Sequence, residues 1–101
     1  MNEEIRNLKP QPLWNKFADL NAVPRPSKKE ERVIAFMKDF GKNLGLETLE
    51  DEVGNVIIRK PATKGMEDRK MVVLQSHLDM VHQKNNDTDF NFDTQGIEMY
   101  V

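Results

Sequence analysis

Apolar residues recur three to four positions apart in two stretches of the first half of the chain, as on one face of a helix. The first stretch follows Pro10 and Pro12 and ends near Asn21, and its apolar members are Leu13, Trp14, Phe17 and Leu20. Proline is tolerated in a first helical turn because the N–H that it lacks would have no partner there. We predict a helix here, with its aromatic side chains in the core.

The second stretch has a start signal, a periodic body and a stop signal. Ser27 to Glu30 has the form of a capping box, a hydroxyl residue followed three positions later by Glu. Apolar residues then follow at helical spacing: Val33, Phe36, Met37, Phe40 and Leu44. Gly45 can adopt the left-handed conformation that ends many helices. This pattern predicts a helix over about residues 28–44.

From Leu46 the spacing changes to that of strands. The segment LETLEDEVGNVIIRK predicts two strands joined by a turn near Gly54 and Asn55, which accept a positive φ. Apolar and charged residues alternate in the first strand, which should be half exposed. The second strand, residues 56–58, is apolar on both faces and should lie more in the interior. Residues 61–69 are expected to form a polar loop.

Residues 71–74 (MVVL) are continuously apolar, as in a strand that is covered on both faces. Two helices, a hairpin and a buried strand together predict an α/β fold. His77 would then follow the carboxyl end of the buried strand, which is where ligand sites of open α/β sheets lie.

His77 and Asp79 form an H-x-D pair that has a metal-binding and a structural interpretation. Strand alternation would send both side chains the same way, and a carboxylate that accepts from one imidazole nitrogen prepares the other to bind a metal. The spacing is common by chance, however, and a zinc site needs at least three protein ligands. From the spacing alone, an ordinary hydrogen-bonded pair is therefore the favoured interpretation, and a metal site is the alternative. The other candidate ligands nearby form no recognisable motif: His82, Asp87, Asp89, Asp93 and Glu98.

The remaining polar features of this region favour a solvated loop. His82 lies in a polar segment, five positions after His77, and is not placed as its partner on a strand. The acidic segment NNDTDFNFD lacks the glycine and the terminal glutamate of an EF-hand calcium loop. We expect His82 to be solvated and residues 82–96 to be mobile.

Composition limits the classes of function. A chain of 101 residues is one domain at most, or part of one. Its 15 basic and 17 acidic residues give no electrostatic reason to expect a nucleic acid or membrane partner. Absence of Cys excludes disulfides, thiolate zinc ligands and a cysteine nucleophile. With a polar N-terminus and no apolar run of about 20 residues, we expect a soluble, cytoplasmic protein. The terminal IEMYV resembles the start of a strand, which suggests a piece of a longer protein.

Four segments together resemble one enzyme family. PQPLW, PRPSKKEERV, EVGNVIIRKPATKGME and VVLQSHLDMVHQKNND are similar, in this order, to the aminoacyl-histidine dipeptidases, also called Xaa-His dipeptidases or peptidase D. These enzymes belong to a clan of dinuclear zinc aminopeptidases and aminoacylases. The resemblance runs from Pro10 to about Asp89, and the combination of GNVIIRKPAT with QSHLDMV is its most specific part.

The resemblance implies roles for two residues and a division of the protein. His77 matches the family's first zinc ligand, and Asp79 matches the aspartate that orients that histidine. The parent protein would hydrolyse Xaa-His dipeptides with two zinc ions, or other divalent metals, and would dimerise through a lid domain. The lid domain, the bridging aspartate and the general-base glutamate lie downstream of residue 101 in the family. Residues 1–101 would thus be the N-terminal part of a single catalytic domain, inactive by itself.

Two alternatives remain open at this stage. The chain could be a complete, non-catalytic α/β binding or scaffold module of the same ancestry. It could also come from another amidohydrolase of the clan, such as a deacetylase or carboxypeptidase, because the residues that select the substrate lie downstream.

Overall fold

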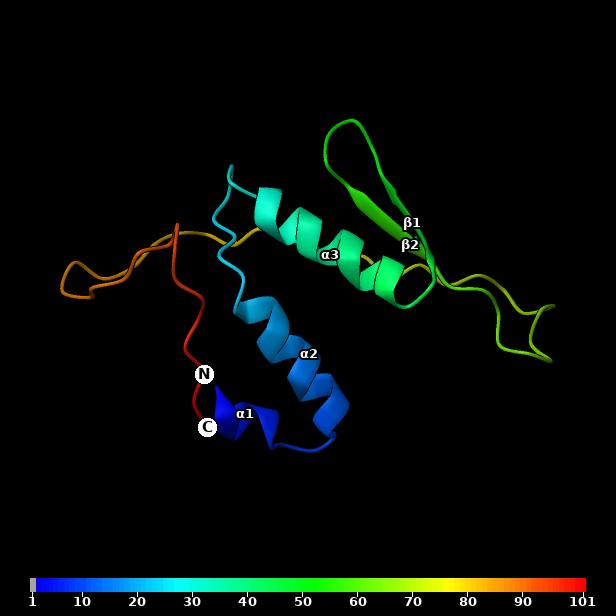
Figure 1. Ribbon diagram of the computed structural model, residues 1–101, viewed down its shortest axis with the longest axis horizontal. Helices are drawn as coiled ribbons and strands as arrows, with labels where there is room; N and C mark the ends of the chain where they lie inside the picture. The colour runs from blue at the N-terminus through cyan, green and yellow to red at the C-terminus, as the bar shows by residue number, and fades with distance from the viewer. Residues whose placement is uncertain (1) are drawn as a thin grey trace.

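The helices and strands of the chain are concentrated in its N-terminal half. A computed structural model describes residues 2–101 (Figure 1). Its elements are α1 (Glu3–Arg6), α2 (Gln11–Asn21), α3 (Glu31–Asn43), β1 (Glu47–Glu50) and β2 (Val56–Arg59). The radius of gyration is 16.2 Å, against about 13 Å for a compact domain of this length. The molecule is therefore extended, because loops project from a small packed region.

α2 confirms the predicted first helix, including its end at Asn21 and a proline in its first turn. α1, which the sequence pattern did not predict, packs against α2 and buries Ile5. The rings of Trp14 and Phe17 lie edge to face, with centroids 5.9 Å apart. Phe17 is nevertheless 45% exposed, so its prediction as a core residue is wrong, because no further layer covers this side of α2.

α3 begins three residues later than predicted, and the capping box is not formed. Lys28 has a φ of 76°, which places residues 27–30 in a turn before the helix. No side chain caps the helix, and the Glu30 carboxylate instead accepts a hydrogen bond from the backbone N–H of Lys28 at 2.8 Å. The predicted stop is confirmed, since Gly45 follows α3 with a φ of 70°.

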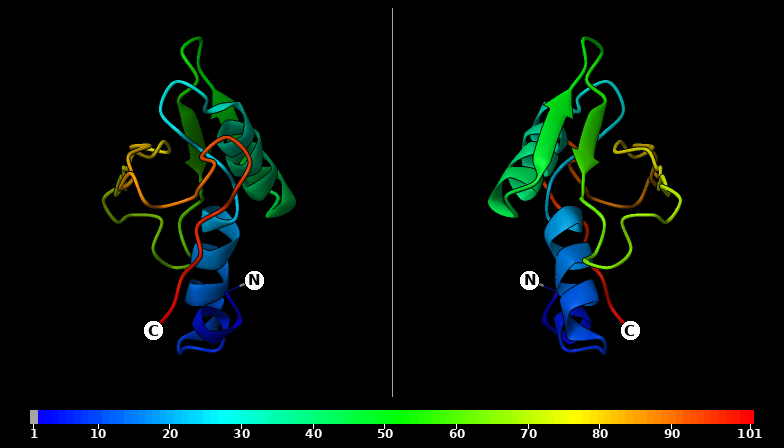
Figure 2. Two further views of the ribbon diagram at one scale, coloured as in Figure 1. Left: turned by 90° about the vertical axis from the view of Figure 1, so that its left-hand side faces the viewer. Right: turned by 90° about the vertical axis from the view of Figure 1, so that its right-hand side faces the viewer.

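β1 and β2 form the predicted antiparallel hairpin, with Thr48 opposite Ile58 and Leu49 opposite Ile57. Gly54 supplies the positive φ of the turn, at 91°. α3 packs against the hairpin (Figure 2), at a point where a side chain on Gly41 would overlap the Thr48 hydroxyl. β2 is not interior as predicted: Ile57 is 47% exposed, because only one face of the hairpin is covered.

The predicted buried strand at residues 71–74 is absent. These four residues pair with no other strand, and each is 79–91% exposed. A continuously apolar strand needs neighbours beside it and layers on both faces, whereas the only sheet in residues 2–101 has two strands and one covering helix. The α/β class is confirmed as three helices plus a two-stranded antiparallel sheet.

The C-terminal segment returns to the N-terminal helices, so that the two termini lie together in Figure 1. The Ile97 N–H donates to the Asn21 carbonyl at 2.8 Å. The Asn2 side chain accepts from the Met99 N–H at 2.8 Å and donates to the Ile97 carbonyl at 3.1 Å. Among residues 2–101, the helices are too short and too polar to cross a membrane.

Candidate metal-ligand site

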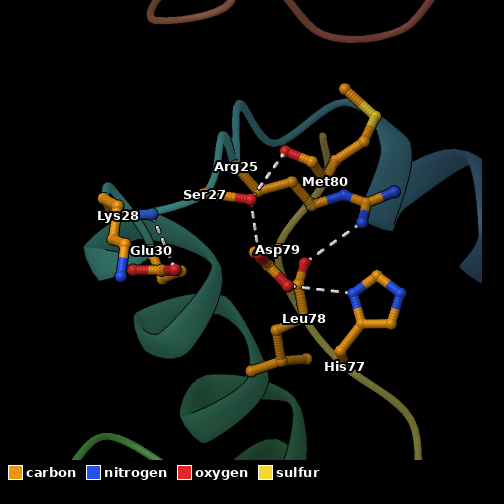
Figure 3. Close-up of polar contacts among 8 residues, drawn as sticks. All are labelled: Arg25, Ser27, Lys28, Glu30, His77, Leu78, Asp79 and Met80. Atoms are coloured by element: carbon orange, nitrogen blue, oxygen red, sulfur yellow. Dashed lines mark hydrogen bonds and ion pairs between the residues drawn. The ribbon is translucent and has the colours of Figure 1, made fainter. Parts of the chain in front are cut away.

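The segment that carries His77 and Asp79 is positioned by the turn between α2 and α3. The Met80 N–H donates to the Arg25 carbonyl at 2.8 Å, and the Ser27 N–H donates to the Met80 carbonyl at 3.1 Å. Pro26 and Met80 thereby form an isolated parallel bridge. His77 therefore projects from a segment fixed by three residues of a turn, and not from the end of a buried strand as predicted (Figure 3).

His77 and Asp79 contact each other as the sequence predicted. The Nδ1 atom of His77 lies 2.9 Å from Oδ1 of Asp79. An ionised carboxylate can only accept a hydrogen bond, so the shared proton belongs to Nδ1 and neutral His77 keeps its lone pair on Nε2. The His77 side chain is 79% exposed, and its second ring nitrogen lies on the side away from Asp79 (Figure 3). The geometry thus leaves one imidazole nitrogen available as a metal ligand.

The second oxygen of Asp79 is also occupied. The Ser27 hydroxyl donates to Oδ2 at 2.5 Å, and the Asp79 side chain is 32% exposed. This hydrogen bond, followed by the one from His77, lowers the pKa of Asp79 below its usual value. The carboxylate therefore stays ionised and remains an acceptor at neutral pH.

Arg25 holds the backbone between the two site residues. Its guanidinium donates to the Leu78 carbonyl at 3.1 Å and to Oδ1 of Asn21 at 2.8 Å. Partial burial lowers the pKa of Arg25, and the charge of Asp79 acts in the opposite direction. Sequence reasoning missed Arg25 and interpreted Ser27 as a helix cap, because a contact across about fifty residues leaves no local pattern.

The other candidate ligands do not join His77. No group of three or more His, Asp or Glu side chains suited to a metal exists among residues 2–101. His82 is exposed, as predicted, and lies 6.3 Å from the Phe92 ring. Asp93 forms an ion pair with Lys29 at 2.9 Å. The described residues therefore offer a metal one histidine nitrogen, whereas a zinc site needs at least three protein ligands.

The fold of the chain matches the N-terminal part of a solved peptidase structure. The chain is 50% identical over 98 residues to the cytosol non-specific dipeptidase of Escherichia coli (strain K12), a match that covers 97% of the chain and 20% of that protein. The crystal structure of aminoacylhistidine dipeptidase from Vibrio alginolyticus matches 98% of the chain, with a TM-score of 0.92 and 45% identity, and 20% of that structure is covered. No family model matches the chain.

The chain is similar to these dipeptidases over nearly its whole length, so the resemblance found in its sequence is confirmed. It spans one fifth of the length of either relative. The match in structure also extends through the irregular C-terminal half, since 98% of the chain is included. The extended path of residues 60–101 is thus part of the shared architecture.

Proposed function

We propose that the chain is the N-terminal part of the catalytic domain of a cytoplasmic, metal-dependent dipeptidase. His77 supplies one zinc ligand, and Asp79 orients it. The hydrogen bond between His77 and Asp79 carries this proposal, because it leaves the exposed Nε2 atom as the ligating nitrogen. The similarity to two dipeptidases over nearly the whole chain supports the class of reaction.

The residues of this chain bind and orient, and they do not themselves attack the substrate. Asp79 accepts the Nδ1 proton, which keeps the His77 ring in one tautomer and makes Nε2 more basic. The pKa of Asp79 is lowered by Ser27 and His77, so the carboxylate is ionised at neutral pH and can accept this proton. Bound zinc would supply an activated water and a polarised carbonyl. The remaining ligands and the general base come from the rest of the protein.

The substrate and assembly follow from the same proposal. We infer a dipeptide substrate with histidine at its second position, and a homodimer formed through a lid domain outside these residues. The two relatives differ in name, one being called non-specific and the other an aminoacylhistidine dipeptidase. A panel of Xaa-His and other dipeptides therefore belongs in the assay, and equal turnover of both kinds would contradict the Xaa-His preference.

A chimera tests the proposal directly. The matching fifth of the Escherichia coli relative is replaced by this chain, and zinc-dependent dipeptide hydrolysis is measured. We expect an active chimera, a loss of more than about 100-fold on His77→Ala, and a loss of about 10–100-fold on Asp79→Ala, the range for groups that orient metal ligands. His82→Ala is the matched control and should keep full activity, while the 101-residue chain by itself should show none.

The same assay separates the alternatives. A folded chimera that hydrolyses dipeptides equally well with and without His77 would refute the assignment of this residue. A folded chimera that is inactive under all metal conditions would favour a non-catalytic binding or scaffold module. Turnover by the isolated 101-residue chain above a zinc-only blank would show that the chain does not need the rest of the enzyme.

A further inference from the structure

Ser27 makes a short contact with Asp79, the side chain that is hydrogen-bonded to His77. Its hydroxyl lies 2.5 Å from Oδ2 of Asp79 and 3.3 Å from the Met80 carbonyl. A hydroxyl has one proton to donate, and a hydrogen bond to a carboxylate is stronger than one to a neutral carbonyl. The Met80 carbonyl already accepts from the Ser27 N–H. The hydroxyl proton is therefore directed to Asp79.

Two donors thus hold the two oxygens of one carboxylate. His77 occupies Oδ1 and Ser27 occupies Oδ2, and this pair of bonds fixes the rotation of the Asp79 side chain about its last torsion. Arg25 is a competing partner, because its buried Nε atom has no acceptor and the charge of Asp79 acts on Arg25. Without the hydroxyl, the carboxylate can turn toward Arg25 or solvent and release the imidazole.

We propose that Ser27 is a positioning residue, whose hydroxyl holds Asp79 in the orientation that selects the Nδ1–H tautomer of His77. The turn before α3 would thereby determine the tautomer of His77, which lies fifty positions away in the sequence. The consequence for metal binding rests on the function proposed above. The effect on the imidazole does not, because the hydrogen bonds lie entirely within this chain.

The tautomer of His77 is the direct readout. Nitrogen-15 NMR of the 101-residue chain, at a pH where both imidazoles are neutral, distinguishes a protonated from an unprotonated ring nitrogen. His82 is an internal reference, because its ring accepts or donates no hydrogen bond within residues 2–101. We expect a several-fold larger fraction of the Nδ1–H form at His77 than at His82, and Ser27→Ala should bring the two fractions together.

Matched variants separate the hydroxyl from the fold. Ser27→Thr keeps the hydroxyl and should retain the Nδ1–H tautomer of His77. The side chain in Ser27→Val has nearly the same shape as that of Thr but no hydroxyl, and this variant should lose the preference for that tautomer. Ser76→Ala removes a neighbouring hydroxyl that bonds to nothing in residues 2–101 and should change nothing. The Thr and Val variants differ in the hydroxyl but hardly in shape. Comparing them therefore shows whether the hydroxyl sets the tautomer of His77, even if Ser27→Ala is poorly folded.

The proposal fails if Ser27→Val leaves the tautomer of His77 unchanged, or if His77 and His82 already show equal fractions in the unsubstituted chain. In the chimera, Ser27→Val should weaken zinc binding about tenfold, the lower end for groups that support a metal ligand, and Ser27→Thr should restore it. A tautomer shift without any zinc binding would reject the proposed metallopeptidase and leave the role of Ser27 intact.

Discussion

The two halves of this chain contain similar apolar segments but bury them very differently. Val33 in α3 is fully buried, whereas Val73, in a run of four apolar residues, is 79% exposed. Residues 3–59 contain every helix and strand of residues 2–101. Hydrogen bonds and an ion pair join residues 60–101 to the first half of the chain at residues 78–80, at Asp93 and near the C-terminus. Hydrophobicity alone therefore does not decide which segment enters a core.

The difference in burial depends on which helices and strands are available to cover each apolar segment. Val33 is covered because α3 is amphipathic and the hairpin follows it closely in the sequence, so both surfaces are local. Residues 71–74 could be buried only by strands on each side and by layers on both faces. This chain covers one fifth of the length of its relatives, and an exposed apolar segment of this kind is also prone to pair with another molecule.

The strongest test of this contrast places the same charge in both halves. Val33→Asp buries an unpaired carboxylate and should lower the free energy of unfolding by at least about 3 kcal/mol. Val73→Asp puts the same group into solvent and should change it by no more than about 0.5 kcal/mol. Urea unfolding followed by circular dichroism measures both. Equal destabilisation by the two substitutions would show that residues 71–74 are buried in solution.

The elements that could be predicted from sequence are those whose determinants are local. The end of α2 at Asn21, the stop at Gly45 and the hairpin turn at Gly54 each follow from a few adjacent residues. The pairing of His77 with Asp79 was also predicted, because the two residues are neighbours. The burial of β2 and of residues 71–74 was not, since it depends on how many strands surround them.

At the start of α3, the residue expected to cap the helix instead has a partner that is distant in the sequence. Ser27 and Glu30 have the spacing of a capping box, but the Ser27 hydroxyl bonds to Asp79 instead of the helix N-terminus. A hydroxyl that donates to a carboxylate can still accept an N–H, but the positive φ of Lys28 turns the chain between Ser27 and the helix, whose N-cap is Glu30. The partner that the hydroxyl does bind lies 52 positions away. For the same reason, the support given to the site by Ser27 and Arg25 has no signature in the adjacent sequence.

Two glycines allow a smaller perturbation of each half. A side chain at Gly41 would overlap Thr48 between α3 and the hairpin, and one at Gly96 would lie 2.7 Å from the Ala22 carbonyl oxygen. Gly41→Ala should cost about 1–3 kcal/mol of global stability through overpacking. Gly96→Ala should mainly release residues 97–99 from α2. Hydrogen exchange distinguishes the two, and faster exchange at Ile97 without global destabilisation is the expected result for Gly96→Ala.

The hairpin turn provides the mildest test, through pH. The pKa of Asp51 is lowered, first by the hydrogen bond from the Asn55 side chain and then by backbone N–H groups of the turn. Because the folded pKa is depressed, this contribution is present above the pKa of the unfolded chain and is lost as the pH falls through the lowered folded value. After correction for the intrinsic exchange rate, amide exchange at Asn55 should therefore be faster in acid, with little change at the fully buried Val33.

Asp51→Asn separates this effect from general acid unfolding. The amide can still accept hydrogen bonds, but it carries no charge and does not titrate. We expect exchange at Asn55 that is faster than in the unsubstituted chain at neutral pH and nearly independent of pH in acid, after correction for the intrinsic exchange rate. If the acid response of Asn55 were the same in both chains, another carboxylate would control the turn, and the hairpin would not open independently of α3.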